Sequence, residues 1–179
     1  NIASHLVLLS VGYGTNLPNQ KISFSQAKNY WYHWFMATQK GEELIKDDPK
    51  GFAKIMWDTW SPAGWYSNEE FELTAQAFNN PDWLEVTLHS YRHRWGHAPS
   101  DPYYANAEAI LNETPIIQVP TLLLHGNEDT VNHPSTSEGK EHFFSNYYER
   151  KLLPKIGHFP QREDAKLIAT ELIGFLNQH

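Results

Sequence analysis

Apolar runs near the two ends of the chain flank a long middle stretch with helical periodicity. Residues 5–11 are an apolar run that ends at Gly12. Because both faces of such a run are apolar, it predicts a buried strand in a parallel sheet. Residues 15–24 are polar and contain Pro18 and Asn19, which predicts a loop.

The middle stretch carries apolar side chains at spacings of three and four, which predicts a set of helices. Asp48 before Pro49, Ser67 and Asp101 are expected helix caps, and Gly96 is an expected helix end. The expected helices span residues 26–39, 49–60, 68–78, 80–94 and 102–111.

The pattern changes at Pro115. Strands are expected at 116–126 and 148–153, a short helix at 137–145, and an amphipathic helix at 163–178. The order is strand, helical insertion, strand, helix, strand, helix, which is typical of an α/β fold. The sequence predicts an α/β sheet domain of residues 1–24 and 113–179, with residues 25–112 inserted as a helical cap, or lid.

Composition narrows the class of protein. The 179 residues are 40% hydrophobic and 14% aromatic, which suits one folded domain with a sizeable core. No run approaches the ~18 apolar residues of a membrane helix, so an integral membrane protein is excluded. The net charge is -7 and the 14 basic residues are scattered, so nucleic-acid binding is not expected. The absence of Cys excludes disulfides and thiol catalysis, and we expect a cytoplasmic location.

Asp129 and His158 carry the best chemical signal. Each follows the end of an expected strand, and ligands of open α/β sheets bind at the carboxyl ends of the strands. A carboxylate that accepts from one imidazole nitrogen leaves the other nitrogen as a base. Both residues are also common in turns after strands, so spacing alone leaves the acid–base pair and two ordinary turn residues open.

Two segments resemble a known family. Val-Pro-Thr-Leu-Leu-Leu-His-Gly-Asn-Glu-Asp-Thr-Val (119–131) resembles the strand and acid loop of α/β-hydrolases, and Gly-His-Phe-Pro-Gln-Arg-Glu-Asp (157–164) resembles their histidine loop. Residues 30–35 and 90–94 are similar to the cap of the epoxide hydrolase and dehalogenase branch. The resemblance implies that Asp129 is the triad acid and His158 the general base.

The chain departs from that family at the nucleophile. It contains no Gly-x-Ser and no Gly-x-Asp, so the elbow that carries the nucleophile is not found, and the chain looks like the C-terminal half of an α/β-hydrolase. The chain also begins at Asn1 without a Met or a signal-like segment. Three interpretations stay open: a fragment of a longer enzyme, a natural truncation, or a replaced nucleophile.

Two of these interpretations carry their own expectation. If the chain is complete, an uncovered sheet edge predicts a homo-oligomer. If the nucleophile is replaced, Ser10, Ser135 and Ser137 are the nearest candidates, although each is more typical of a turn or a cap.

The expected cap contains Tyr32 and Tyr91, which the resemblance places as hydrogen-bond donors to an epoxide oxygen. Trp34 belongs to an aromatic run that lines either a substrate pocket or the core of the lid. The competing interpretation for both tyrosines is that they are aromatic residues of the lid core. Trp57, Trp60 and Trp65 are expected to pack within the lid.

The histidines at 89, 93 and 97 are spaced by four residues, which places such side chains on one helix face. Gly96 ends the expected helix before the third of them, and Arg92 and Arg94 oppose a cation. We therefore expect no metal site.

The resemblance implies nucleophilic hydrolysis of a small-molecule substrate, namely a small apolar ester, epoxide or halide, with no cofactor. An upstream Ser or Asp forms a covalent ester, and His158, oriented by Asp129, activates water. The alternative is a catalytically inactive binding or assembly module that self-associates, which the missing elbow favours.

Overall fold

The computed structural model describes residues 3–14 and 21–179, and these divide into two compact units. The sheet unit contains residues 3–14, 60–65 and 113–179, and the helical unit contains residues 21–59 and 66–112. The loop predicted over residues 15–24 lies mostly outside the described residues.

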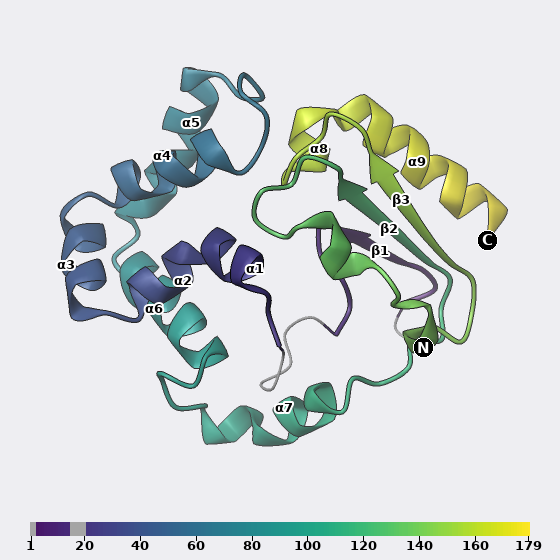
Figure 1. The fold of residues 1–179 in the computed structure, drawn as a ribbon, viewed down its shortest axis with the longest axis horizontal. Coiled ribbons are helices and arrows are strands. Elements are labelled where there is room, and N and C mark those ends of the chain that lie inside the picture. Colours follow the sequence, from purple (N-terminus) through teal and green to yellow (C-terminus); the bar gives the residue numbers. More distant parts are fainter. Residues whose placement is uncertain (1–2, 15–20) are drawn as a thin grey trace. The chain divides into compact units, whose positions relative to one another are not determined.

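The sheet unit is built on three parallel strands in the order β1-β2-β3 (Figure 1). The strands are β1 (Leu6–Leu9), β2 (Thr121–Gly126) and β3 (Tyr148–Leu153). In the register of the ladder, Leu124 lies between Leu9 and Lys151. Parallel neighbours need crossover connections, and the one between β1 and β2 contains every described residue of the helical unit. The predicted α/β class is confirmed.

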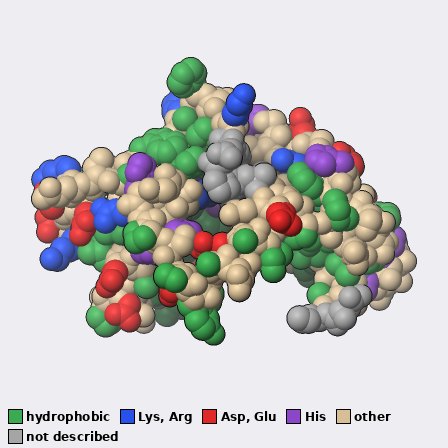
Figure 2. All heavy atoms as spheres, turned by 90° about the horizontal axis from the view of Figure 1, so that it is seen from below, with side chains coloured by type: hydrophobic (Ala, Val, Ile, Leu, Met, Phe, Trp, Pro, Cys, Tyr) green, Lys and Arg blue, Asp and Glu red, His purple; other side chains and the backbone are tan. Residues whose placement is uncertain are grey.

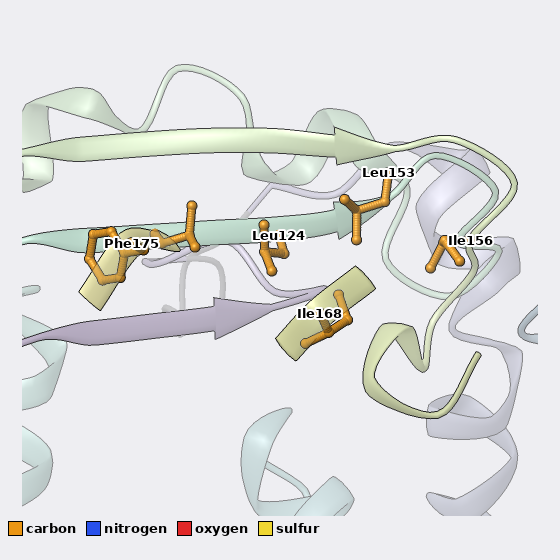
Figure 3. Packing of buried hydrophobic residues seen from close by; sticks show 6 residues of the cluster. Leu124, Leu153, Ile156, Ile168 and Phe175 are labelled. Atoms are coloured by element: carbon orange, nitrogen blue, oxygen red, sulfur yellow. The ribbon is translucent and has the colours of Figure 1, made fainter. Parts of the chain in front are cut away.

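One face of the sheet packs against helix α9 (Ala165–Gln178). Figure 3 shows Ile168 and Phe175 of this helix beside Leu124 and Leu153 of the sheet. Burying each of these side chains contributes about 1.5–3 kcal/mol. Every residue of β2 is buried, which agrees with its position as the central strand.

The other face of β2 carries Thr121, Leu123 and His125, because successive side chains of a strand alternate between faces. The 3₁₀ segment η3 (Pro134–Ser137) lies against this face, and the Oγ of Ser137 is 2.9 Å from the Nδ1 of His125.

Three elements predicted in the sheet unit have other bounds in the structure. The strand begins at Thr121 rather than at 116, after Pro120, which has no N–H; only Ile117 forms an isolated bridge upstream. The helix expected at 137–145 is instead the end of η3 and the 3₁₀ segment η4 (Glu141–Phe143), interrupted at Gly139, whose φ is +66°. The last helix is divided into α8 (Pro160–Glu163) and α9 at Asp164, whose Oδ1 caps α9 by accepting from the N–H of Leu167 at 2.9 Å.

The helical unit contains seven α-helices among its described residues. They are α1 (Phe24–Asn29), α2 (Trp31–Met36), α3 (Gln39–Asp47), α4 (Pro49–Thr59), α5 (Asn68–Ala75), α6 (Trp83–Arg94) and α7 (Ala105–Asn112), with 3₁₀ segments η1 (Gln76–Asn79) and η2 (Pro102–Tyr104). The predicted caps are confirmed: Asp48, Ser67 and Asp101 each accept a hydrogen bond from a backbone N–H of the following turn. Gly96 has a φ of +75° just after α6.

The helix predicted at 26–39 is wrong in its continuity. The helix is interrupted at Tyr30, which follows α1 and precedes α2. The ring of Tyr30 stacks on that of His33, with 4.3 Å between the ring centroids. A straight helix would point some of the aromatic rings of this segment away from the core. Two shorter helices allow several of the rings to be buried together. Helix α3, capped by Thr38, was not indicated by the pattern.

On the face that Figure 2 draws, the described Lys and Arg side chains are interspersed with Asp and Glu. Within residues 3–14 and 21–179, none of the helices has the length and apolar character needed to cross a membrane.

Candidate active site

Asp129 lies in the turn that follows β2, and this turn is joined to the one that follows β3. The N–H groups of Asn127 and Glu128 donate to the carbonyls of Leu153 and Ile156, both at 2.9 Å. Gly126 permits this approach, because a Cβ there would meet the backbone oxygens of residues 156 and 157. The two chain segments are therefore held together at the carboxyl ends of neighbouring strands.

The side chain of Asp129 is fully buried, and both of its carboxylate oxygens have hydrogen-bond donors. Oδ1 accepts from the N–H groups of Val131 and Asn132 at 2.8 and 2.9 Å, and Oδ2 lies 2.9 Å from Nδ1 of His158. Burial raises the pKa of Asp129, but hydrogen bonds from His125, His158 and the backbone outweigh it, and the net pKa lies below its usual value. The group is an ionised acceptor.

His158 follows β3, and its side chain is 19% exposed. An ionised carboxylate only accepts, so Nδ1 carries the hydrogen that donates to Asp129. In the neutral ring the lone pair is then on Nε2, the nitrogen that acts as a base in such pairs.

The backbone around His158 is held by a serine and a carboxylate. The Oγ of Ser61 accepts from the His158 N–H at 2.9 Å and donates to Oε1 of Glu163 at 2.6 Å. Glu163 also accepts from the N–H groups of Phe159 and Gly157, at 2.8 and 2.7 Å. One carboxylate thus binds three donors and sets the path of the histidine loop.

Two tryptophans predicted to pack within the lid instead contact this loop. The Trp60 ring meets His158 edge-on at 5.2 Å between centroids, and Trp65 stacks on Phe159 at 4.8 Å. Their segment, residues 60–65, belongs to the sheet unit although helical residues flank it in sequence. Trp57 does pack in the helical unit, against Tyr66. No local periodicity distinguishes these three tryptophans, and only tertiary contacts separate them.

None of the three serine candidates is hydrogen-bonded to His158 in the described structure. Ser10 is buried with a φ of +53°, and its Oγ has no hydrogen-bond partner. Ser135 is bonded to His133, and Ser137 is fully buried among His125, Arg150 and Pro134. The geometry assigns none of them as the nucleophile.

Tyr32 and Tyr91 come together in the helical unit, with ring centroids 5.4 Å apart in an edge-to-face arrangement. Burial raises the pKa of both phenols, so both keep their hydrogens at neutral pH. Trp34 packs against Trp95 and donates to the carbonyl of Ala27 at 2.8 Å. The two tyrosines are thus neighbours, and Trp34 is a half-buried residue that packs within the helical unit.

His33 also belongs to this cluster, although its position in the sequence did not predict a role for it. Its Nδ1 accepts from Trp95 Nε1 at 2.9 Å, its ring lies 4.7 Å from that of Tyr91, and its Nε2 is buried without a hydrogen-bond partner. Burial and the positive charge of Arg94 lower its pKa to about 3. The sequence feature that could have identified it is a single histidine within the aromatic run of residues 30–35.

The histidine series on α6 is only partly clustered. The rings of His89 and His93 stack at 5.8 Å, and His93 lies 2.8 Å from Ser100 and 3.2 Å from Glu108. Over residues 3–14 and 21–179, no three His, Cys, Asp or Glu side chains are grouped so as to hold a metal ion.

Solved structures share this fold. The chain matches a candidate epoxide hydrolase from Klebsiella pneumoniae with a TM-score of 0.86 and 29% identity, over 97% of this chain and 58% of that one. A candidate acyltransferase from Salmonella enterica matches with a TM-score of 0.75 and 22% identity, over 98% and 56% of the two chains. A candidate α/β hydrolase from a Nostoc species matches with a TM-score of 0.74 and 18% identity, over 97% and 58%.

No protein-family model and no curated protein sequence matches the chain. The chain therefore has a partial α/β-hydrolase fold and spans less than two thirds of the structures it matches. Its structural neighbours include epoxide hydrolases as well as other α/β hydrolases.

Proposed function

We propose, starting from the partial α/β-hydrolase fold of this chain, that it belongs to a hydrolase in which His158 is the general base and Asp129 orients it. The observation that carries the proposal is the 2.9 Å hydrogen bond between Nδ1 of His158 and the buried Oδ2 of Asp129. It favours the tautomer with a free lone pair on Nε2 and stabilises the imidazolium formed when that nitrogen takes a proton.

The proposed reaction has two steps. The oxygen of a Ser or Asp nucleophile, for which these 179 residues offer no elbow, bonds to the substrate carbon while the bond from that carbon to an alkoxide oxygen or a halide breaks. A Ser hydroxyl gives its proton to His158 Nε2, which passes it to the departing alkoxide, whereas an Asp carboxylate carries no proton and the alkoxide of an opened epoxide takes its proton from water. His158 Nε2 then takes a proton from water, whose oxygen attacks the covalent ester. The nucleophile is released, and the proton returns from His158 to the departing oxygen.

The proposed substrates are small apolar esters, epoxides or halides. Tyr32 and Tyr91 are neutral phenols that donate hydrogen bonds to a developing alkoxide or halide. The unpartnered Nε2 of His33 is a donor of the same kind, because Trp95 already occupies the lone pair on Nδ1. The helical unit is proposed as the cap that binds the apolar part of the substrate, and no cofactor is required.

The test measures turnover of p-nitrophenyl butyrate and styrene oxide by the 179-residue chain and by the full product of its gene. His158→Ala and Asp129→Asn are each expected to reduce turnover by at least about 10³-fold, because the base is lost or held in the wrong tautomer. His97→Ala, at an exposed position, is the matched control and stays within about twofold of the original rate. Unchanged hydrolysis in His158→Ala contradicts the proposal.

The second candidate is an inactive binding or assembly module, favoured by the absence of a Gly-x-Ser or Gly-x-Asp elbow. Self-association through an edge strand such as β1 is its expected mode, since β1 pairs only with β2 among the described strands. Absence of turnover by both proteins, together with a gene that encodes no upstream elbow, favours this candidate. Analytical ultracentrifugation then measures the oligomeric state.

A further inference from the structure

A second histidine is buried beside the proposed acid. His125 is fully buried near the end of β2, directly after three leucines, on the face that does not pack against α9. Burying a polar ring costs free energy unless each of its nitrogens finds a partner. The partners of His125 therefore indicate what the ring does at this position.

The Nε2 of His125 faces the acid turn. It lies 2.8 Å from the carbonyl oxygen of Asn132 and 3.4 Å from Oδ2 of Asp129. A carbonyl oxygen only accepts, so Nε2 must carry a hydrogen. The same turn is anchored to the residue that follows β1, because Nδ2 of Asn132 donates to the carbonyl of Ser10 at 2.8 Å.

The Nδ1 of His125 is connected to the neighbouring strand β3 through the hydroxyl of Ser137. It lies 2.9 Å from the Oγ of Ser137, which accepts from Nε of Arg150 on β3 at 2.7 Å. The Ser137 hydroxyl also lies 3.0 Å from the carbonyl of Pro134, which accepts from Arg150 at 2.6 Å. The carbonyl of Asn132 places the hydrogen of a neutral His125 ring on Nε2, which leaves Nδ1 as an acceptor that faces the Ser137 hydroxyl.

We infer that His125 is a positioning residue for Asp129: its Nε2–H holds the turn 129–132 closed and keeps Oδ2 directed at His158. This inference rests on the proposed function for its meaning in catalysis, although the geometry is independent of turnover. Two strands and the residue that follows a third contribute to the arrangement: β2 through His125, β3 through Arg150, and Ser10 directly after β1. The alternative is that His125 only fills space in the core.

Two polar substitutions separate these roles. His125→Gln places an amide nitrogen near the position of Nε2 and keeps the donor to Asn132, whereas His125→Asn places its amide near Nδ1 and loses that donor. Both remove the ring, and a space-filling role predicts a larger loss of unfolding free energy in the smaller His125→Asn but the same His158 tautomer in both. A positioning role predicts that only His125→Asn disturbs His158.

The measurement is the ¹⁵N chemical shift of both ring nitrogens of His158, read through the carbon-bound ring protons in the 179-residue chain at pH 8. The original chain and His125→Gln are expected to show the Nδ1–H tautomer of His158. In His125→Asn this signature is expected to be lost in favour of a mixture of tautomers, with urea unfolding measured alongside. Retention of the Nδ1–H tautomer in His125→Asn, or equal loss in both variants, overturns the inference.

The original chain supplies a test that does not depend on folding of the variants. His125 itself is expected to show the Nε2–H tautomer, and the Nδ1–H tautomer overturns the inference. Asp129→Asn is expected to shift the Nε2 resonance of His125, and an unchanged resonance likewise overturns it. If neither the 179-residue chain nor the full gene product hydrolyses the two substrates and the tautomers are nevertheless as expected, the proposed function fails and the positioning role stands.

Discussion

The Nδ1 of His158 lies 2.9 Å from Oδ2 of Asp129, although 29 positions separate the two residues in sequence. Each side chain follows one of two neighbouring parallel strands, so the sheet brings their loops to the same edge. The leucine-rich core under β2 and β3 fixes those strands, and the pair is therefore held by packing as well as by its own hydrogen bond.

Gly157 is expected to be intolerant of any side chain. A Cβ there would lie 2.5 Å from the Cα of Ser61, which is backbone and cannot rotate away. Gly157→Ala is expected to lower the free energy of unfolding by about 1–3 kcal/mol and to displace His158. Gly174→Ala in α9 is the matched control, since its Cβ meets nothing within 4 Å, and it is expected to stabilise by about 0.5–1 kcal/mol. Urea unfolding measures both, and equal effects would contradict this account.

Glu163 is expected to stabilise the histidine loop through its three donors, Ser61, Gly157 and Phe159. Glu163→Ala leaves these partly buried groups without their acceptor and is expected to cost about 2–4 kcal/mol of unfolding free energy. Glu43→Gln removes an exposed carboxylate paired with Lys40 and is expected to cost less than about 0.5 kcal/mol. If the two variants unfold at the same urea concentration, the proposed holding role of Glu163 is wrong.

His33 is expected to make stability depend on pH. Burial and Arg94 lower its pKa from 6.5 to about 3 in the folded chain, so below pH 6.5 the unfolded state binds a proton that the folded state does not. The free energy of unfolding is therefore not reduced by His33 above pH 6.5, and it decreases as the pH falls from 6.5 toward 3. Between pH 7 and pH 5 the expected loss is about 2 kcal/mol.

The control for His33 is His33→Asn, whose amide oxygen is able to accept from Trp95 and does not titrate in this range. Urea unfolding of both proteins at pH 7 and pH 5 gives the difference that belongs to the imidazole. Identical pH dependence in the two proteins would show that His33 is not held neutral.

Tyr91 is expected to distinguish epoxides from activated esters in a protein that hydrolyses both. Ring opening generates an alkoxide that a phenol donor stabilises, whereas p-nitrophenolate needs no such donor. Tyr91→Phe is expected to slow styrene oxide turnover by about 100-fold and to leave p-nitrophenyl butyrate turnover within about twofold. Tyr104→Phe, at an exposed tyrosine, is the control. Equal losses on both substrates would assign Tyr91 to packing.

The positions of several helices and strands could be predicted where residue type or periodicity gave a clear local pattern. The strand at 148–153 and the caps at Asp48, Ser67 and Asp101 were read directly from residue type and periodicity. The straight helix at 26–39 was wrong because several rings of one segment are buried together, which periodicity does not describe.

The sequence by itself indicated the α/β class and singled out Asp129 and His158 as a candidate acid and base, because strand ends and short loop motifs are local features. The tertiary structure alone decided what surrounds them. Ser61 and Glu163 hydrogen-bond to the histidine loop, His125 hydrogen-bonds to the turn that follows β2, and the ring of Trp60 lies beside the imidazole of His158. These residues lie up to 102 positions from their hydrogen-bond partners. Only the packing of the sheet unit brings such distant positions within bonding distance, and no local pattern records it.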